Sequence, residues 1–320
     1  MVPGLRPLAK SDLDDVVALA RSVCEADHLD DIPSREQVAS QFDIPGLDLT
    51  QYAWVVTGPR GGLDALVSAV PLPSADRLTI HIGCEVKPER RGAGLEERLF
   101  RFAEVQATRG AEGVPDGAVF HSGIKATQTE RAELLVRLGY RAVRWFLVLE
   151  RPLAELAEEA AKPPGFSDEV LSPLDLSDDA FLVLDESFRD HWNQARFTLE
   201  QFRHLLTSIA TAPLQTLLAR DPRGEPAGVC IAHVLAHKNA EKGTREGEVA
   251  VLGVRRPYRG RGLGAHLLLR SLAWLRRQGM EVATIGVDAE SLTGAHRLYE
   301  RVGFTERSRA VVYHKRVRPG

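Results

Sequence analysis

The sequence predicts an α/β protein of mixed α+β class, with two tandem domains that each contain a mixed β-sheet flanked by helices. The chain has 320 residues, which is enough for about two domains of ordinary size. Short apolar runs typical of strands alternate along it with amphipathic segments typical of helices. The pattern of the first half also returns in the second half, as a duplicated unit would produce.

The repeat is clearest in two basic segments that contain glycine. VKPERRGAGL in the first half aligns without a gap with VRRPYRGRGL in the second, so that Val254 falls on Val86. Farther along, Gly303-Phe304 falls on Gly139-Tyr140. We therefore expect an internal duplication. Its expected segments are an N-terminal domain at residues 1–151, a linker at 152–166, and a C-terminal domain at 167–320.

Each half has a similar expected order of elements. In the first half, strands are expected at residues 52–57, 63–70 and 78–86, with helices beginning near Ser11 and after Ser34. In the second half, helices are expected from residue 176 and from Thr198, and strands at 214–220 and 227–235. The polar segment AHKNAEKGTREGE is expected to form a loop before the next strand.

Composition is that of an ordinary globular protein. Hydrophobic residues make up 44%, charged residues 27%, and the formal net charge is −3, so no global charge favours nucleic acid or a membrane surface. No apolar run is long enough to span a membrane. The cysteines, Cys24, Cys84 and Cys230, form no CxxC pair, which argues against a disulfide framework or a metal site and favours the cytoplasm. We expect a monomer or homodimer.

The segment VAVLGVRRPYRGRGLG, residues 249–264, predicts an anion site. It reads as a buried strand, a basic glycine-rich turn and the start of a helix. The first turn of a helix leaves backbone N–H groups unpaired and carries partial positive charge. Glycines let a phosphate approach that backbone closely, and arginines add charged hydrogen bonds. We therefore expect a ligand with two or more phosphates.

Two phosphate-binding folds fit this segment poorly. Gly260-x-Gly262-x-x-Ala265 matches the dinucleotide fingerprint GxGxxG/A, but five residues separate Val254 from the first glycine, where the fingerprint needs that glycine at the strand end. Too little chain follows for the rest of such a sheet. A P-loop is excluded because no Lys-Ser/Thr pair follows the glycines.

Residues 259–264 resemble the pattern [Gln/Arg]-x-x-Gly-x-[Gly/Ala], the coenzyme A pyrophosphate loop of the GNAT N-acetyltransferase superfamily. GVDAESLTGAHRLYERVGF, residues 286–304, resembles that family's closing strand, loop and helix. One departure is Leu292, where the family often has asparagine. The resemblance covers roughly residues 5–150 and 168–317. It implies a splayed sheet in each half, with acetyl-coenzyme A as co-substrate and no metal.

The resemblance also implies which residues bind the coenzyme. The strand that would hold the pantetheine arm and thioester supplies Leu252, Gly253 and Val254. The loop that would hold the pyrophosphate supplies Arg259, Gly260, Arg261, Gly262, Leu263, Gly264 and Ala265. Arg255 and Arg256 are further candidates for phosphate oxygens, with solvated surface charge as the alternative.

The implied reaction is attack of a primary amine, on a small molecule or peptide, upon the thioester. An alkylammonium of pKa about 10 must first lose a proton, so a general base is expected. Glu248 is the candidate, because an even separation from Val254 places both side chains on one face of a strand; Glu246 is the second choice. Tyr299 matches the family's general acid. The alternatives are a solvated carboxylate and a packing tyrosine.

The first half keeps only part of this pattern. Arg91, Gly92 and Gly94 match the loop of the second half and form a possible second coenzyme A site. Glu96, however, stands where the second half has Gly264. Ile80 and Leu135 fall at the places of the base and the acid. We expect the N-terminal domain to be catalytically silent.

Among tandem members of the superfamily the layout resembles the mycothiol synthases. This resemblance implies Glu36, Lys238 and His191 as candidates for contact with the acceptor. The alternatives are a solvated carboxylate for Glu36 and a core or helix-capping role for His191. Asn193, where those enzymes have an acidic residue nearby, is a departure. Two further hypotheses stay open. One is a mycothiol synthase proper, which would act on a cysteinyl-glucosaminyl-inositol. The other is a non-catalytic acyl-coenzyme A sensor or interaction module.

Overall fold

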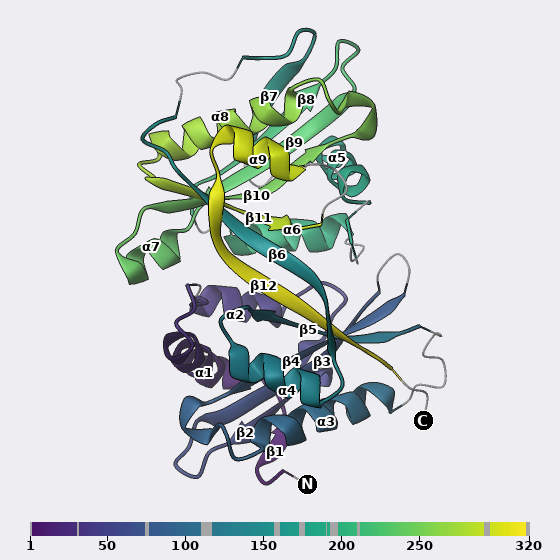
Figure 1. Ribbon diagram of the computed structural model, residues 1–320, viewed down its shortest axis with the longest axis vertical. Helices are drawn as coiled ribbons and strands as arrows, with labels where there is room; N and C mark the ends of the chain where they lie inside the picture. Colours follow the sequence, from purple (N-terminus) through teal and green to yellow (C-terminus); the bar gives the residue numbers. More distant parts are fainter. Residues whose placement is uncertain are drawn as a thin grey trace. The chain divides into compact units, whose positions relative to one another are not determined.

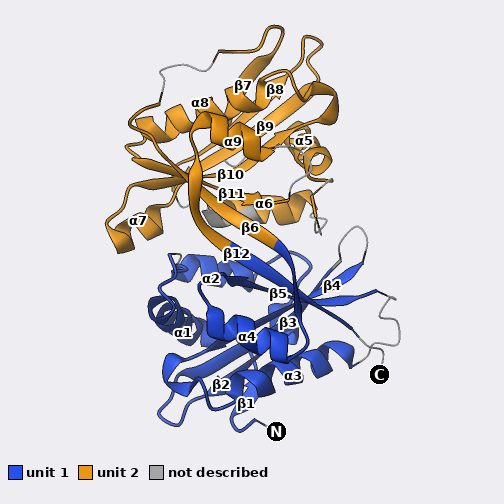
Figure 2. Cartoon of the chain, in the orientation of Figure 1, with its two compact units in different colours: residues 1–144, 310–320 blue, residues 145–309 orange. Residues whose placement is uncertain are grey.

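The computed structural model describes residues 2–30, 32–73, 77–109, 117–156, 161–172, 177–189, 191–192, 198–209, 212–290 and 295–317. Leu292 and Asn193, the two departures from the family pattern, lie outside these residues. The chain forms two compact units, shown in different colours in Figure 2. Unit 1 comprises residues 1–144 and 310–320, and unit 2 comprises residues 145–309.

Unit 1 has the strand order β1-β2-β3-β4-β5-β12. Its elements from the first part of the chain are β1 (Leu5–Pro7), α1 (Leu13–Ala26), α2 (Arg35–Gln41), β2 (Ala53–Thr57), β3 (Leu63–Pro73), β4 (Leu78–Val86), α3 (Leu95–Thr108), β5 (Val119–Lys125) and α4 (Thr129–Arg137). One core cluster packs α3 and α4 against the sheet, and a second packs α1 and α2 against it. α2 begins after Ser34 as expected, and Ser34 caps it, since its hydroxyl accepts from the N–H of Gln37.

Unit 2 has the strand order β6-β11-β10-β9-β8-β7. Its elements are β7 (Ser167–Leu171), α5 (Asp178–Phe188), α6 (Leu199–Ile209), β8 (Leu214–Arg220), β9 (Pro226–Val234), α7 (Ala236–Lys242), β10 (Glu246–Val254), α8 (Leu263–Arg277), β11 (Val282–Asp288) and α9 (Ala295–Val302). Figure 1 labels them along the chain. Helices α8 and α9 pack on one face of the sheet, and α5 and α6 pack on the other.

Two strands pass from one unit into the other. β6 (Arg141–Pro152) begins in unit 1, and residues 146–152 pair with β11 in unit 2. β12 (Thr305–Arg316) begins in unit 2, and residues 310–316 pair with β5 in unit 1. Each strand therefore changes colour along its length in Figure 2. Because of this exchange, the units differ from a simple division at residues 151 and 167.

The polar segment after β9 contains a helix, α7, where the sequence analysis expected only a loop. The expectation was wrong because a short polar helix has no apolar periodicity to reveal it. The helix is held by a tertiary contact. The side-chain amide of Asn239 donates to the carbonyl of Glu246 at 2.8 Å, and its oxygen accepts from the N–H of Glu246 at 2.8 Å. α7 is thereby fixed to the start of β10.

Candidate active site

The sheet of unit 2 opens between β10 and β11. The two strands pair in parallel at only three positions, which join residues 246–248 to residues 282–284. Beyond Glu248 and Thr284 no pairing continues between them, and a cavity of about 790 Å³ lies there. Its walls include residues 249–254 except Val251, residues 285–288, and parts of α5, α8 and α9. The opening of the sheet thus creates the cavity.

A bulge at Ala250 changes which way β10 directs its side chains. In the pairing with β9, Val249 lies opposite Ala232 and Val251 opposite Ile231, so Ala250 is an extra residue. Val254 packs with the α8 cluster, whereas Glu248 contacts His233 on the α5 and α6 face. The expectation that Glu248 and Val254 share one face was therefore wrong, because one extra residue reverses the alternation.

The backbone of β10 beyond the bulge offers hydrogen-bonding groups to the cavity. Leu252, Gly253 and Val254 all line it and pair antiparallel with β9. In such a pair, only alternate residues direct their N–H and C=O groups to the neighbouring strand. The remaining groups point to the side from which β11 has diverged. A ligand with amide groups in an extended arm, such as pantetheine, fits this edge.

The loop after β10 has the geometry of an anion site. Gly260 and Gly262 have φ values of +74° and +82°, which an L side chain rarely adopts. Gly262 caps α8 without a side-chain hydrogen bond, and the first bond within the helix runs from His266 N–H to Gly262 C=O at 3.0 Å. The N–H groups of residues 263–265 therefore lie in the first turn, where a helix leaves them unpaired. Residues 260 and 262–265 line the cavity.

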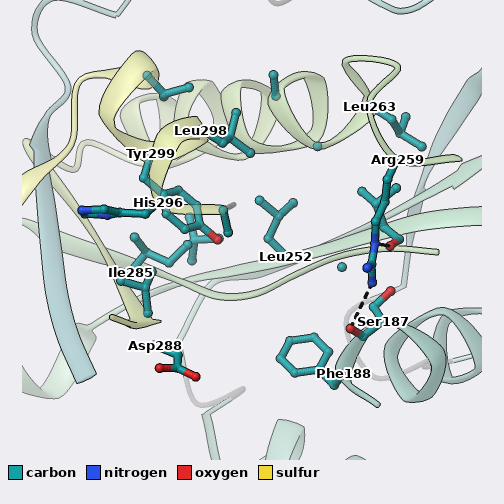
Figure 3. Close-up of a pocket in the computed structure, with 18 of the residues that line it drawn as sticks. Ser187, Phe188, Leu252, Arg259, Leu263, Ile285, Asp288, His296, Leu298 and Tyr299 are labelled. Atoms are coloured by element: carbon teal, nitrogen blue, oxygen red, sulfur yellow. Dashed lines mark hydrogen bonds between the residues drawn. The ribbon is translucent and has the colours of Figure 1, made fainter. Parts of the chain in front are cut away.

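Arg259 acts within this loop as an anchor. Its Nε donates to the carbonyl of Val254 at 2.9 Å, and an Nη donates to the carbonyl of Ser187 at 3.4 Å, the bond dashed in Figure 3. Arg255 is likewise held by Glu186 at 2.6 Å. Arg261 alone of the ten predicted coenzyme residues does not line the cavity. Its guanidinium lies 6.0 Å from the Tyr258 ring.

Tyr299 enters the cavity from α9, above β10 in the view of Figure 3. It is 6% exposed and packs edge-on against Phe304, with ring centroids 6.0 Å apart. Burial, with a smaller contribution from Cys230, raises the pKa of Tyr299 above its usual value. The phenol therefore stays protonated at neutral pH, as a proton donor must.

The carboxylates on the α5 and α6 face have different environments. The Glu248 side chain is 37% exposed and lies 3.3 Å from Nε2 of His233. Glu246 is buried and accepts from Lys238 at 2.9 Å and from Arg307 at 2.8 Å. Burial raises the pKa of Glu246, but the bonds from Arg307 and Lys238 outweigh it and lower that pKa overall. A doubly paired carboxylate is a poor base, which favours Glu248.

The three residues expected to contact the acceptor have different positions. His191 lines the cavity and contacts the Phe188 ring, with centroids 4.3 Å apart. Lys238, on α7, is paired with Glu246 and does not line the cavity. Glu36 is exposed on α2 in unit 1.

Unit 1 reproduces the loop geometry without the same side chains. Gly92 and Gly94 have φ values of +77° and +74°, and Nε of Arg91 donates to the carbonyl of Val86 at 3.1 Å, as Arg259 does in unit 2. Glu96 lies half-buried in the first turn of α3. The loop conformation is therefore duplicated, whereas its chemistry is not.

In unit 1, His81 is the structural equivalent of Glu248. β4 and β5 also pair in parallel at three positions, the last of which joins His81 to His121. β4 pairs with β3 without a bulge, so Ala250 has no counterpart in unit 1. Residues before Ala250 therefore match positions in β4 that are one residue later than the ungapped sequence alignment gives. The match of Ile80 to Glu248 was therefore wrong. Leu135, aligned with Tyr299, is fully buried in α4.

Several residues that line the cavity were not singled out from the sequence. They are Phe146, Ser187, Phe188, Asp288 and His296. Phe146 comes from β6, whose crossing into unit 2 has no signal in the sequence. Asp288 ends β11, directly after an apolar run, and this position at a strand end could have marked it. Figure 3 shows Asp288 and Phe188 on the side of the cavity opposite Tyr299.

Within the described ranges, no cluster of three or more His, Cys, Asp or Glu side chains is arranged to hold a metal ion. The same part of the chain contains no helix that is both long and apolar enough to cross a membrane.

A family model and proteins of similar sequence both indicate an acetyltransferase. A family model described as the acetyltransferase (GNAT) family matches residues 178–304. Proteins named mycothiol acetyltransferase, from Salinispora arenicola and Thermobispora bispora, are 32% and 31% identical to this chain; the alignments cover 95% of this chain and 93% and 96% of those proteins.

Solved structures show the same fold. A GCN5-related N-acetyltransferase from Sphaerobacter thermophilus has a TM-score of 0.72 at 28% identity, covering 99% of this chain and 96% of that one. A tandem GNAT protein from the clavulanic acid biosynthesis pathway has a TM-score of 0.73 at 17% identity, covering 99% of both chains. The second likeness concerns the fold alone.

Proposed function

This chain belongs to the acetyltransferase (GNAT) family, and from that premise we propose that unit 2 transfers an acetyl group from acetyl-coenzyme A to a primary amine by direct attack. The single observation that carries the proposal is the cavity between β10 and β11, which joins the glycine loop at residues 260–264 to Tyr299. Acetyl-coenzyme A extended along β10 would place its phosphates on the loop and its acetyl group near the point where β10 and β11 separate.

The reaction needs two proton movements. The amine nitrogen forms a bond to the acyl carbon, and the bond from that carbon to sulfur breaks. Glu248 takes the proton from the amine, directly or through water. Tyr299 gives its phenolic proton to the sulfur and regains a proton from water. Glu248 is partly exposed on the α5 and α6 side of the sheet, and Tyr299 lines the cavity from α9, so the base and the acid would act from opposite sides of the sheet.

We propose that the acceptor is the amine that mycothiol acetyltransferases acetylate, taken as a cysteinyl-glucosaminyl-inositol. Full-length relatives with that name support this. Phe146, Phe188 and His191 line the cavity, and Figure 3 shows Phe188 on the side opposite Tyr299. Ring-shaped substrates pack well against aromatic side chains. A simple primary amine is the broader alternative, and it would be acetylated equally well if the wall had no selective role.

The test is release of coenzyme A thiol from acetyl-coenzyme A with this acceptor and with ethanolamine. Wild-type protein is expected to release thiol with the first at a much higher kcat/KM. Glu248→Gln should lower kcat by about 100-fold or more, whereas Glu281→Gln, an exposed carboxylate paired with Arg245 at 3.1 Å, should not. Binding of acetyl-coenzyme A without thiol release to either amine would favour the sensor hypothesis.

A further inference from the structure

His233 is a buried polar residue that the proposed reaction does not yet use. It lies on β9, directly opposite Glu248 in the antiparallel register. Its side chain is 8% exposed, and Nε2 lies 3.3 Å from the nearer Glu248 oxygen. Burying an imidazole requires a hydrogen-bond partner, and this carboxylate supplies one.

The alternation of β9 places this pair on the acceptor side of the sheet. Val229 and Ile231 pack with α5 and α6, whereas Cys230 and Ala232 pack with the α8 cluster. His233 continues the first set, so its ring lies on the face of α5 and α6. Glu248 is also the last β10 residue paired with β11 before the sheet opens. The β10 wall of the cavity begins at the next residue, Val249, so the pair lies just outside the lining.

Charged side chains near the pair form ion pairs with one another. Lys238 from α7 and Arg307 from β12 both bond to Glu246, and Arg307 also lies 3.5 Å from Glu150 of β6. The registers place Leu214 of β8 opposite His233 and Thr284 of β11 opposite Glu248. The α5 and α6 residues packed on this face include Val183 and Phe202. His233 lies within hydrogen-bond distance of Glu248.

We propose that His233 is a positioning residue for the base. Its Nε2–H donates to one oxygen of Glu248 and leaves the other oxygen for the acceptor amine. His233 takes no proton from the substrate; the proton stays on Glu248 until water removes it. The bond therefore fixes the orientation of the Glu248 carboxylate. This inference rests on the proposed role of Glu248.

The test replaces His233 in two ways. His233→Leu removes the donor while keeping a side chain of similar size, and His233→Gln keeps a donor at about the same reach. Loss of a hydrogen bond to a charged group should lower kcat about tenfold and leave the KM for acetyl-coenzyme A unchanged. His233→Gln should restore most of kcat. Calorimetric affinity for acetyl-coenzyme A should stay at the wild-type value in both variants.

The controls separate this inference from the proposed function. His121→Leu removes a half-buried strand histidine of unit 1 and should leave kcat at the wild-type value. In the background of Glu248→Gln, His233→Leu should have no further effect on kcat. If Glu248→Gln is slow but His233→Leu keeps the wild-type kcat, His233 only packs and the inference is wrong. If Glu248→Gln keeps full turnover, the role of Glu248 itself fails.

Discussion

Replacing Gly262 by alanine tests whether the loop conformation is what binds the phosphates. At φ +82°, an added Cβ would meet no atom closer than 3.7 Å, from Pro163, so the cost is conformational and not steric. An L residue in this region costs about 1–2 kcal/mol. If the loop relaxes to avoid that strain, ligand binding must restore the strained conformation. The affinity for acetyl-coenzyme A should then fall about 5- to 30-fold.

Gly94→Ala is the matched variant in unit 1. Gly94 has φ +74° with no atom within 4 Å of an added Cβ, and it also caps a helix. Urea denaturation should show both variants losing about 1 kcal/mol of unfolding free energy. Calorimetry with acetyl-coenzyme A should show weaker binding only for Gly262→Ala. Equal losses of affinity in the two variants, or no loss in Gly262→Ala, would refute the assignment of the coenzyme to the unit 2 loop.

Three other predictions concern the cavity and its surroundings. Tyr299→Phe should lower kcat about 100-fold with little change in acetyl-coenzyme A affinity, whereas the control Tyr313→Phe should keep the wild-type kcat. Equal kcat in the two variants would contradict the role of Tyr299 as the acid. Phe146→Ala should raise the acceptor KM about tenfold without changing coenzyme affinity, and steady-state kinetics that show no change would exclude β6 from the acceptor wall. Because the folded-state pKa of Glu246 is lowered, its stabilisation is complete above the unfolded value near 4.5 and is lost as pH falls through the folded value. Glu246→Gln should therefore flatten the acid-side decline in unfolding free energy, and an unaltered decline would contradict the ion-pair assignment.

The glycine loop could be predicted because its signal is local. Alternating glycines, a preceding apolar run and a following amphipathic helix constrain the backbone within a few residues. Gly260 and Gly262 adopt the conformation that only glycine tolerates well. The duplication could be predicted for the same reason, since the two loops share both pattern and backbone geometry. The fold class followed from these segments and from the strand and helix periodicities.

Other features depend on contacts distant in the sequence. The bulge at Ala250 reverses the direction of Glu248 relative to Val254, but no residue type in VAVLGV marks it. The crossing of β6 brings Phe146 into the unit 2 cavity, although it belongs to the first half of the repeat. Helix α7 is fixed by Asn239 against β10. In each case tertiary pairing, and not local propensity, decides the outcome.

The measurement that tests the central claim most directly is amide hydrogen exchange with and without saturating acetyl-coenzyme A. The account predicts slower exchange at two segments of unit 2, residues 252–254 and residues 263–265, where backbone N–H groups would bond to the pantetheine arm and the pyrophosphate. It predicts no slowing at residues 95–97, the corresponding helix start of unit 1. Slowing confined to unit 1, or no slowing in either unit at saturation, would contradict the placement of the coenzyme between β10 and β11.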